Sequence, residues 1–177
     1  KALNRGLKLV VIDPRRCDVA EKAHVHLQVK PGEDASLLAC IIREIIENNW
    51  YDAQYVADYV SGFEALYKAV QPFTLDYTQR RTTCPSADIV EAARTFATAA
   101  SGAALSGTGL HMARHQNLTT QLVQTLNAIC GRFDRVGGMP RIAGTLGPEL
   151  PTSGNQPLPV ALRTEQRARL RDIQGIT

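Results

Sequence analysis

Asp13 is the acidic residue of this sequence best placed to contact a ligand. It follows the apolar run of residues 9–12 and precedes Pro14 and two arginines, Arg15 and Arg16. A carboxylate at the end of a strand accepts two parallel hydrogen bonds, from a ribose diol or from the N1–H and amino group of a guanine. An aspartate before proline is also typical of a turn. The residues alone leave both roles open.

A second acidic pair, Glu33 and Asp34, follows Pro31 and Gly32 at the start of an apolar helical pattern. Free backbone N–H groups at a helix start favour anionic side chains. Asp34 is therefore expected as a helix N-cap, as a ligand contact, or as both.

A glycine turn follows later, at Gly107, Thr108 and Gly109. Glycine lets the backbone come close to a ligand because it has no Cβ. His111 and His115 stand four residues apart and could share a helical face as metal ligands. No acidic residue accompanies them, so a metal site is disfavoured.

Several other chemistries lack their motifs. No phosphate-binding P-loop and no nucleophile elbow occurs in the sequence. The cysteines at 17, 40, 84 and 130 are far apart, which argues against a zinc site or an iron–sulfur cluster in this segment and favours reduced packing thiols. The net charge of +3 is dispersed along 177 residues, so nucleic acid is not an expected partner. No apolar run is long enough for a membrane helix, and no leader sequence opens the chain.

Strand and helix patterns alternate along the chain. Residues 7–13 form a continuous apolar run, typical of a strand buried on both faces, whereas residues 24–30 alternate and predict a more exposed edge strand. Residues 35–49 predict a strong amphipathic helix. Further helices are expected at residues 53–59, 62–70, 85–100 and 117–131, and a short strand at 103–106, with an aromatic packing set formed by Tyr51, Tyr55, Tyr59, Phe63 and Tyr67. The helix at 117–131 is expected to be capped by Asn117 and to bury Leu118, Leu122, Leu126 and Ile129.

This alternation predicts an α/β domain with a parallel sheet and helices on both faces. Ligands of such sheets bind beyond the carboxyl ends of the strands, where Asp13 is expected. Residues 141–159 predict an irregular connection, and residues 161–173 a short basic helix with a solvated face.

Two blocks carry a family resemblance. The segment GLKLVVIDPRRCDVAEKAHVHLQVKPGEDASLL and the later segment SGTGLHMARHQNLTTQLVQTLNAICGRFDRVGG occur in the expected order and cover most of residues 6–138. Together they resemble the molybdopterin oxidoreductase family, the dimethyl sulfoxide reductase superfamily of catalytic subunits. The chain departs from the family pattern at Glu33, where threonine is usual, and at Met112, where a polar side chain is common.

The resemblance implies a Rossmann-like domain over residues 1–140 that binds the guanosine part of a bis(molybdopterin guanine dinucleotide) cofactor with molybdenum or tungsten. Residues 141–177 would connect it to the next domain. Asp13 and Asp34 match the family's guanosine contacts. Arg15 and Arg16 lie against phosphate or the purine in one interpretation and are surface arginines in the other. The implied cofactor-binding residues are Asp13, Arg15, Gly32, Glu33, Asp34, Gly107, Thr108, Gly109, His111 and Met112.

The function implied is that of a fragment of a molybdenum or tungsten oxidoreductase that transfers oxygen atoms or electrons to or from a small substrate such as formate, nitrate or a sulfur oxyanion. No catalytic residue or metal ligand is identifiable in the fragment, which alone is expected to be inactive. A [4Fe-4S] cluster is expected in a preceding part of the protein. The expected partners are the other domains of the subunit and electron-transfer subunits, without membrane contact from this segment. The alternative is a non-catalytic nucleotide-binding or regulatory α/β domain.

Overall fold

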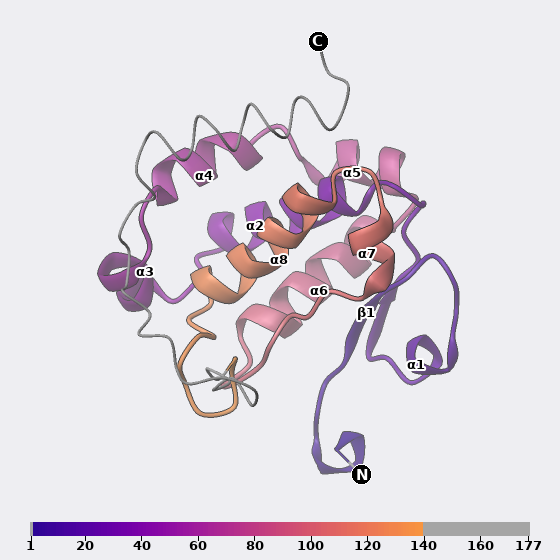
Figure 1. The fold of residues 1–177 in the computed structure, drawn as a ribbon, viewed down its shortest axis with the longest axis horizontal. Coiled ribbons are helices and arrows are strands. Elements are labelled where there is room, and N and C mark those ends of the chain that lie inside the picture. The colour runs from indigo at the N-terminus through magenta and orange to yellow at the C-terminus, as the bar shows by residue number, and fades with distance from the viewer. Residues whose placement is uncertain (1, 140–177) are drawn as a thin grey trace, which may run out of the picture. The chain divides into compact units, whose positions relative to one another are not determined.

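The computed structural model describes residues 2–139, which form a mixed α/β fold that is mostly helical (Figure 1). The two strands are β1 (Val10–Ile12) and β2 (Val25–Leu27). The helices are α1 (Asp18–Glu21), α2 (Asp34–Glu47), α3 (Ala53–Tyr59), α4 (Phe63–Val70), α5 (Leu75–Thr82), α6 (Ser86–Ala97), α7 (Thr108–Met112) and α8 (Gln116–Ile129), with a 3₁₀ turn at Leu3–Arg5. The expected connection at 141–159 and basic helix at 161–173 lie outside the described residues.

The sheet contains β1 and β2, paired in parallel through the crossover that carries α1. Val10 lies opposite Val25, and Ile12 lies opposite Leu27. The predicted parallel sheet is therefore confirmed for these two strands. The strand expected at residues 103–106 does not form within the described chain, because the backbone of Ala104 bonds to the side chain of Asn127 and not to a neighbouring strand.

The burial of the two strands is the reverse of the expected order. All three residues of β1 are half-buried, whereas Val25, Leu27 and Val29 are buried. The prediction that residues 24–30 form the more exposed strand is wrong, because α6 packs on β2 and covers its apolar face. The predicted alternation itself is confirmed, since every second residue of this segment points into the core.

Helix α2 is the centre of the core and contacts α4, α5, α6 and α8. Its apolar residues recur in pairs every four positions, which places them on one wide face. The members Leu37, Leu38, Ile41, Ile42, Ile45 and Ile46 are all buried. Residues 35–49 were predicted as one helix, and the structure confirms it with an end at Glu47.

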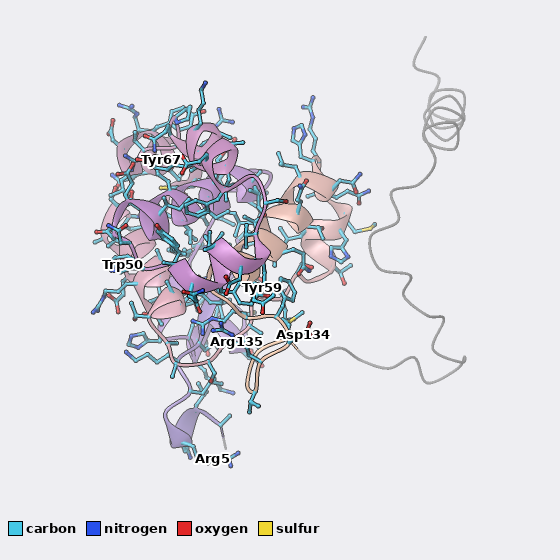
Figure 2. The ribbon with its side chains drawn as sticks, turned by 90° about the vertical axis from the view of Figure 1, so that its left-hand side faces the viewer. Arg5, Trp50, Tyr59, Tyr67, Asp134 and Arg135 are labelled. Atoms are coloured by element: carbon cyan, nitrogen blue, oxygen red, sulfur yellow. The ribbon has the colours of Figure 1, made fainter. Side chains whose placement is uncertain are left out.

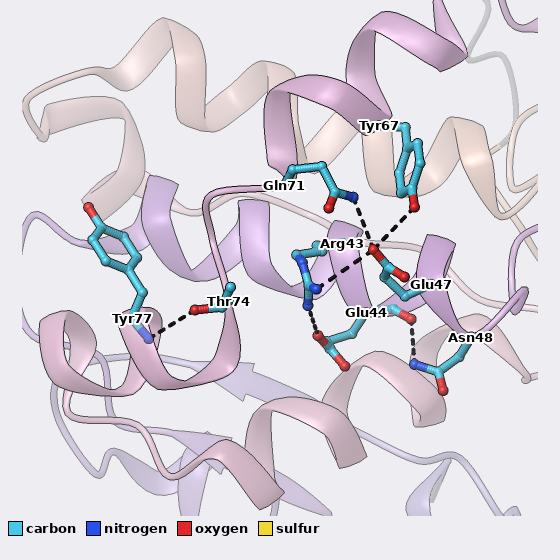
Figure 3. A network of polar contacts seen from close by, with 8 residues as sticks. All are labelled: Arg43, Glu44, Glu47, Asn48, Tyr67, Gln71, Thr74 and Tyr77. Atoms are coloured by element: carbon cyan, nitrogen blue, oxygen red, sulfur yellow. Dashed lines mark hydrogen bonds and ion pairs between the residues drawn. The ribbon is translucent and has the colours of Figure 1, made fainter.

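The polar face of α2 is joined to α4 and the turn that follows it (Figure 3). The carboxylate of Glu47 accepts hydrogen bonds from Gln71 Nε2 at 3.0 Å and from the Tyr67 hydroxyl at 3.3 Å. Both interactions lower the pKa of Glu47, the bond from Gln71 most strongly. Arg43 pairs with the buried Glu44 at 2.7 Å. These contacts hold the polar face of α2 to α4, beside the apolar packing of Phe63, Leu66 and Tyr67 on the core.

Helix α8 begins at Gln116, after His115 in a left-handed conformation (φ 67°), and not at a cap formed by Asn117. Its expected core residues Leu122, Leu126 and Ile129 are buried, but Leu118 is 49% exposed. Leu118 lies in the first turn of α8, close in the chain to the short α7, which contacts α8. The aromatic set packs partly in pairs, with Tyr51 on Phe63 and Tyr55 on Tyr59, although Tyr59 is largely exposed.

Candidate functional site

A cavity of about 550 Å³ opens beyond the carboxyl ends of β1 and β2. Its walls come from the turn after β1, from the end of β2 and from the turn between α5 and α6. The lining residues are Pro14, His26, Gln28, Val29, Lys30, Pro31, Thr83, Cys84, Pro85 and Asp88. We call this space the strand-end cavity. It lies where a parallel sheet is expected to bind its ligand.

Hydrogen bonds from β2 and the residues that follow it hold the cavity walls together. His26 Nε2 lies 2.9 Å from the carbonyl oxygen of Asp13, and Gln28 Nε2 donates to the carbonyl oxygen of Pro14 at 3.0 Å. On the other side, the backbone N–H of Lys30 donates to the carbonyl oxygen of Thr82 at 2.9 Å. One polar face of β2 and its extension therefore fixes both the turn after β1 and the end of α5.

Asp13 is half-buried and forms a turn. Its Oδ1 accepts the backbone N–H of Arg15 at 2.7 Å. Proline at position 14 removes one backbone donor, but the next residue supplies another, so the carboxylate is not left without a local partner. Within residues 2–139 no donor reaches the other carboxylate oxygen. The turn and a ligand contact are therefore compatible at Asp13. Arg15 and Arg16 are exposed.

Asp34 is the first residue of α2, and the N-cap position belongs to Glu33. Burial raises the pKa of Asp34, and the negative charges of Asp13 and Glu33 raise it further. The two aspartates predicted as guanosine contacts are thus close enough to interact electrostatically.

Glu33 is held by Arg81 of α5 in a two-bond ion pair. Arg81 Nε lies 2.8 Å from Oε2 and Nη2 lies 2.7 Å from Oε1, while the Ser36 hydroxyl donates to Oε2 at 2.8 Å. The hydrogen bond from Arg81 is the main reason that the pKa of Glu33 is lowered. The carboxylate of Glu33 therefore joins the start of α2 to α5. Gly32, before it, has φ +89°, a conformation that favours glycine.

The glycine turn lies beside α7, and its predicted ligand-contacting residues are exposed. Apart from the adjacent residues and the backbone of α7 itself, no protein atom lies within 4 Å of the position that a Cβ would take on Gly107 or Gly109, so the surface is open there. Thr108 is exposed, and Met112 is 82% exposed. His111 Nε2 lies 2.8 Å from the Ser106 hydroxyl.

A second cavity, of about 360 Å³, is lined by His111, Gln116, Asn117 and Thr120. His111 lies in α7, and His115 lies in the turn that precedes α8, so the two histidines do not share one helical face. No group of three potential metal ligands occurs in the part of the chain that the structure describes. The predicted residues thus form two groups. The first, Asp13, Arg15, Gly32, Glu33 and Asp34, follows or precedes Pro14 and Pro31 in the chain, but none of its members lines the strand-end cavity. The second lies along the glycine turn.

The segment before the glycine turn is held by Asn127, which is completely buried in α8. Its Oδ1 accepts the N–H of Ala104 at 2.8 Å, and its Nδ2 donates to the carbonyl oxygen of Ala104 at 2.9 Å. The side chain thereby replaces a neighbouring strand for this residue. Asn127 positions residues 103–106 and hence the turn that follows them.

The loop after α8 is fixed by two arginines. Arg135 Nη1 pairs with Asp52 at 2.7 Å and its guanidinium lies 4.9 Å from the ring centre of Tyr55, so the loop is attached to α3 (Figure 2). Buried Arg132 donates to three carbonyl oxygens at the end of α6, those of Phe96, Ala97 and Ala99. Both arginines therefore have structural partners.

Six polar residues line the strand-end cavity and none of them was predicted as a ligand contact: His26, Gln28, Lys30, Thr83, Cys84 and Asp88. The two-residue period of strand 24–30 places Gln28 and Lys30 on the same face as His26, which is a signal for these three. Thr83 and Cys84 come from the turn between α5 and α6, and Asp88 comes from the first turn of α6. Their position depends on the packing of α6 against the sheet, which no local pattern shows.

Individual known proteins resemble this chain in sequence, although no family model matches it. Acetylene hydratase from Syntrophotalea acetylenica is 36% identical over 132 residues, which are 75% of this chain and 18% of that protein. Formate dehydrogenase H from Escherichia coli K12 is 37% identical over 109 residues, covering 62% of this chain and 15% of the relative. The thiosulfate reductase molybdopterin-containing subunit PhsA from Salmonella typhimurium is 31% identical over 139 residues, covering 78% and 18%.

The fold agrees with these sequence similarities. The structure of acetylene hydratase from Pelobacter acetylenicus matches with a TM-score of 0.74 at 35% identity, over 77% of this chain and 19% of that chain. The chain therefore spans less than a fifth of the length of each of these proteins. No helix within residues 2–139 is long and apolar enough to cross a membrane. The resemblance seen in the two sequence blocks is confirmed: over most of its length, this chain belongs to the molybdopterin oxidoreductase family, the dimethyl sulfoxide reductase superfamily of catalytic subunits.

Proposed function

We propose that this chain is the nucleotide-binding part of a molybdenum- or tungsten-dependent oxidoreductase and that its strand-end cavity holds the guanosine part of a molybdopterin guanine dinucleotide. The observation that carries the proposal is the cavity itself, which lies beyond the carboxyl ends of two parallel strands. Its volume of about 550 Å³ is within the range of small-molecule sites.

The relatives support a role in cofactor binding and not in substrate choice. Their names describe a hydratase, a formate dehydrogenase and a thiosulfate reductase, which act on different substrates. All three nevertheless share this segment at 31–37% identity. A segment common to such different reactions is best explained by a group that the reactions share.

Residues next to the cavity in the chain fit such a group in their chemistry. The second carboxylate oxygen of Asp13 would accept a hydroxyl of the ribose, and Asp34, whose pKa the charge of Asp13 helps to raise, would take part in the same site. Arg15 would pair with a phosphate oxygen. Gly32 allows the sharp turn before α2, while Glu33 keeps the start of α2 in place through Arg81.

The glycine turn serves the pterin part of the cofactor in this proposal. Gly107 and Gly109 leave room for a close backbone approach, and Thr108, His111 and Met112 line the same surface. The bound molybdenum or tungsten would supply oxygen-atom or electron transfer. The role of this chain is to bind and orient the cofactor and to line part of the substrate funnel.

The rest of the proposed architecture extends beyond this chain. Strand β1 pairs only with β2 in the described residues, and its apolar side chains are half-buried. A further strand supplied by the rest of the subunit would complete a Rossmann-like sheet over the domain proposed for residues 1–140. Residues 141–177 lead to the next domain. We also propose a [4Fe-4S] cluster elsewhere in the subunit and electron-transfer subunits as partners.

The proposal is tested by the metal and pterin content of the full-length subunit carrying Asp13→Ala or Asp13→Asn. Asparagine keeps an acceptor for the N–H of Arg15, so it preserves the turn while removing the charge. Both variants are expected to lose cofactor, since a charge-assisted bond contributes about 1.5–3 kcal/mol. Asp58→Asn, on the exposed face of α3, is the matched control.

Full cofactor content in a folded Asp13→Asn variant would contradict the role given to Asp13. A wild-type subunit that binds guanine nucleotides but never contains metal or pterin would instead support the alternative, a non-catalytic nucleotide-binding domain.

A further inference from the structure

We propose that α7, the first turns of α8 and the preceding Leu105 form a docking surface for another part of the same catalytic subunit. Three large apolar side chains carry the inference. Leu105 is 76% exposed, Met112 is 82% exposed and Leu118 is 49% exposed. We call the surface that carries them the α7–α8 face. The inference goes beyond the proposed function, because it concerns what covers this face and not what the strand-end cavity holds.

The three side chains come from neighbouring pieces of the structure. The Ser106 hydroxyl lies 2.8 Å from His111 Nε2, which ties the segment of Leu105 to α7. Helix α7 contacts α8, and the two lie side by side in Figure 1. His111 of α7 and Thr120 of α8 line the same cavity, of about 360 Å³. The apolar side chains therefore belong to one surface, which is hollowed where the two helices meet.

The α7–α8 face is almost free of charged residues. Asp, Glu, Lys and Arg make up 21% of the whole chain, yet Arg114 is the only one of them among residues 95–131. The exposed polar residues of α8 are the amides Gln116, Asn117, Gln121 and Gln124. By contrast, α2, α4, α5 and α6 each carry both acidic and basic residues. Exposed apolar side chains on a surface without charge are the composition of an interface core.

Exposed apolar side chains elsewhere have a different setting, as Tyr59 of α3 shows. Tyr59 is 73% exposed, but its ring stacks on Tyr55 at a centroid distance of 4.9 Å. The adjacent Asp58 accepts a hydrogen bond from Gln54 at 2.8 Å, so the exposed side of α3 is polar. Single exposed apolar residues of this kind are normal on a protein surface and need no partner. Tyr59 therefore serves as the comparison for the α7–α8 face.

The occupant of the face is the remaining polypeptide of the same subunit. In the relatives, the matching segment is only 15–18% of the protein, so more than four-fifths of each lies outside it. Those parts are tethered to this segment by the peptide chain, whereas a second copy must associate from solution. The docking partner is expected to present an apolar surface without charge, because a charge facing this surface would be buried without a counter-ion.

Hydroxyl-radical footprinting of the full-length holoenzyme, with mass spectrometry, measures the solvent exposure of each side chain. Leu105, Met112 and Leu118 should lose most of the modification that they show in denaturant, although this chain by itself exposes them. Tyr59 should keep most of its modification and is the internal reference. Strong modification of Leu105 and Leu118 in the native holoenzyme would overturn the inference.

Two further samples identify the occupant. The protection should persist in the subunit produced without cofactor and in a sample diluted until the subunit is monomeric. Protection that disappears with the cofactor would show that the cofactor covers the face, which overturns this inference and supports the proposed function. Protection that disappears on dilution would assign the face to a second copy and overturn it as well.

Leu105→Glu and Tyr59→Glu form a matched pair of variants, because the two side chains are exposed to the same extent in this chain. In the full-length subunit, Leu105→Glu removes a buried apolar contact and should raise the rate of limited proteolysis about 10- to 100-fold. Tyr59→Glu should stay within about twofold of wild type, as a surface substitution does. Leu105→Met keeps the apolar contact and should behave like wild type. Equal proteolysis rates in the two glutamate variants would contradict docking at this face.

Discussion

Replacement of Asn127 by leucine removes the two hydrogen bonds that hold the backbone of Ala104. The side chain of Asn127 is completely buried and bonds both to the N–H of Ala104 at 2.8 Å and to its carbonyl oxygen at 2.9 Å. Leucine fills a similar volume but offers neither a donor nor an acceptor. The segment that precedes the glycine turn therefore loses its only described polar partner at this position.

The expected cost comes from the two lost bonds and from the unpaired backbone groups. Each bond contributes about 1 kcal/mol net, and a half-buried N–H or C=O left without a partner adds to this, for a total of about 3 kcal/mol. A free energy of this size changes the opening equilibrium of the segment by about 100-fold.

Hydrogen–deuterium exchange at the amide of Ala104 measures that opening directly. The Asn127→Leu variant should exchange there about 100-fold faster than wild type, whereas Gln124→Ala, on the exposed face of the same helix, should not change the rate. Asn127→Asp keeps an acceptor for the N–H of Ala104 and should lie between the two. Exchange within threefold of wild type in Asn127→Leu would refute the claim that this side chain positions the segment.

Three further predictions concern the packing around the site. Glu33→Gln should lower the free energy of unfolding by about 1 kcal/mol at pH 7, as measured with urea, since Arg81 is half-exposed and solvent weakens the pair. Because the pKa of Glu33 is lowered in the fold, its contribution is present above the pKa of the unfolded chain and is lost as the pH falls, so the difference should shrink toward pH 3. A thiol reagent should label Cys17 alone in the native chain, because the other three cysteines are buried and burial raises their pKa, whereas all four should react in denaturant. Asp52→Ala should cost about 1–2 kcal/mol, because Asp52 caps α3 and pairs with Arg135, and proteolysis should then cut the loop after α8 faster than in wild type.

The buried faces of the elements whose apolar residues recur with a regular period could be predicted from the sequence. The paired apolar residues of α2 predict its buried face, and the alternation of residues 24–30 predicts which side chains of that segment point inward. Local patterns are reliable here because each of these elements buries one continuous face.

The exceptions arise from contacts between distant segments. A small-residue run predicted a strand at residues 103–106, but Asn127, more than 20 residues away, takes the role of the neighbouring strand. The apolar run at residues 9–12 predicted full burial, but only one edge of β1 is paired in the described chain. Asp13 followed by Pro14 left two roles open, a turn and a ligand contact. The structure shows the turn, and the ligand contact stays a prediction.

The residues that line the cavity could not be predicted from the sequence for the same reason. The sequence blocks propose Asp13, Asp34 and the glycine turn as ligand contacts, and these stay predictions. Asp88 lines the cavity only because α6 packs on β2. Such a position is fixed by tertiary packing and has no local signature.

The location of the guanine base in the full-length holoenzyme tests the central claim most directly. A structure of that enzyme with its cofactor, from crystallography or electron cryo-microscopy, should place the base in the strand-end cavity between Pro14 and Asp88. The ribose should then lie within hydrogen-bonding distance of Asp13. A base bound outside this cavity, with Asp13 contacting only the N–H of Arg15, would contradict the account.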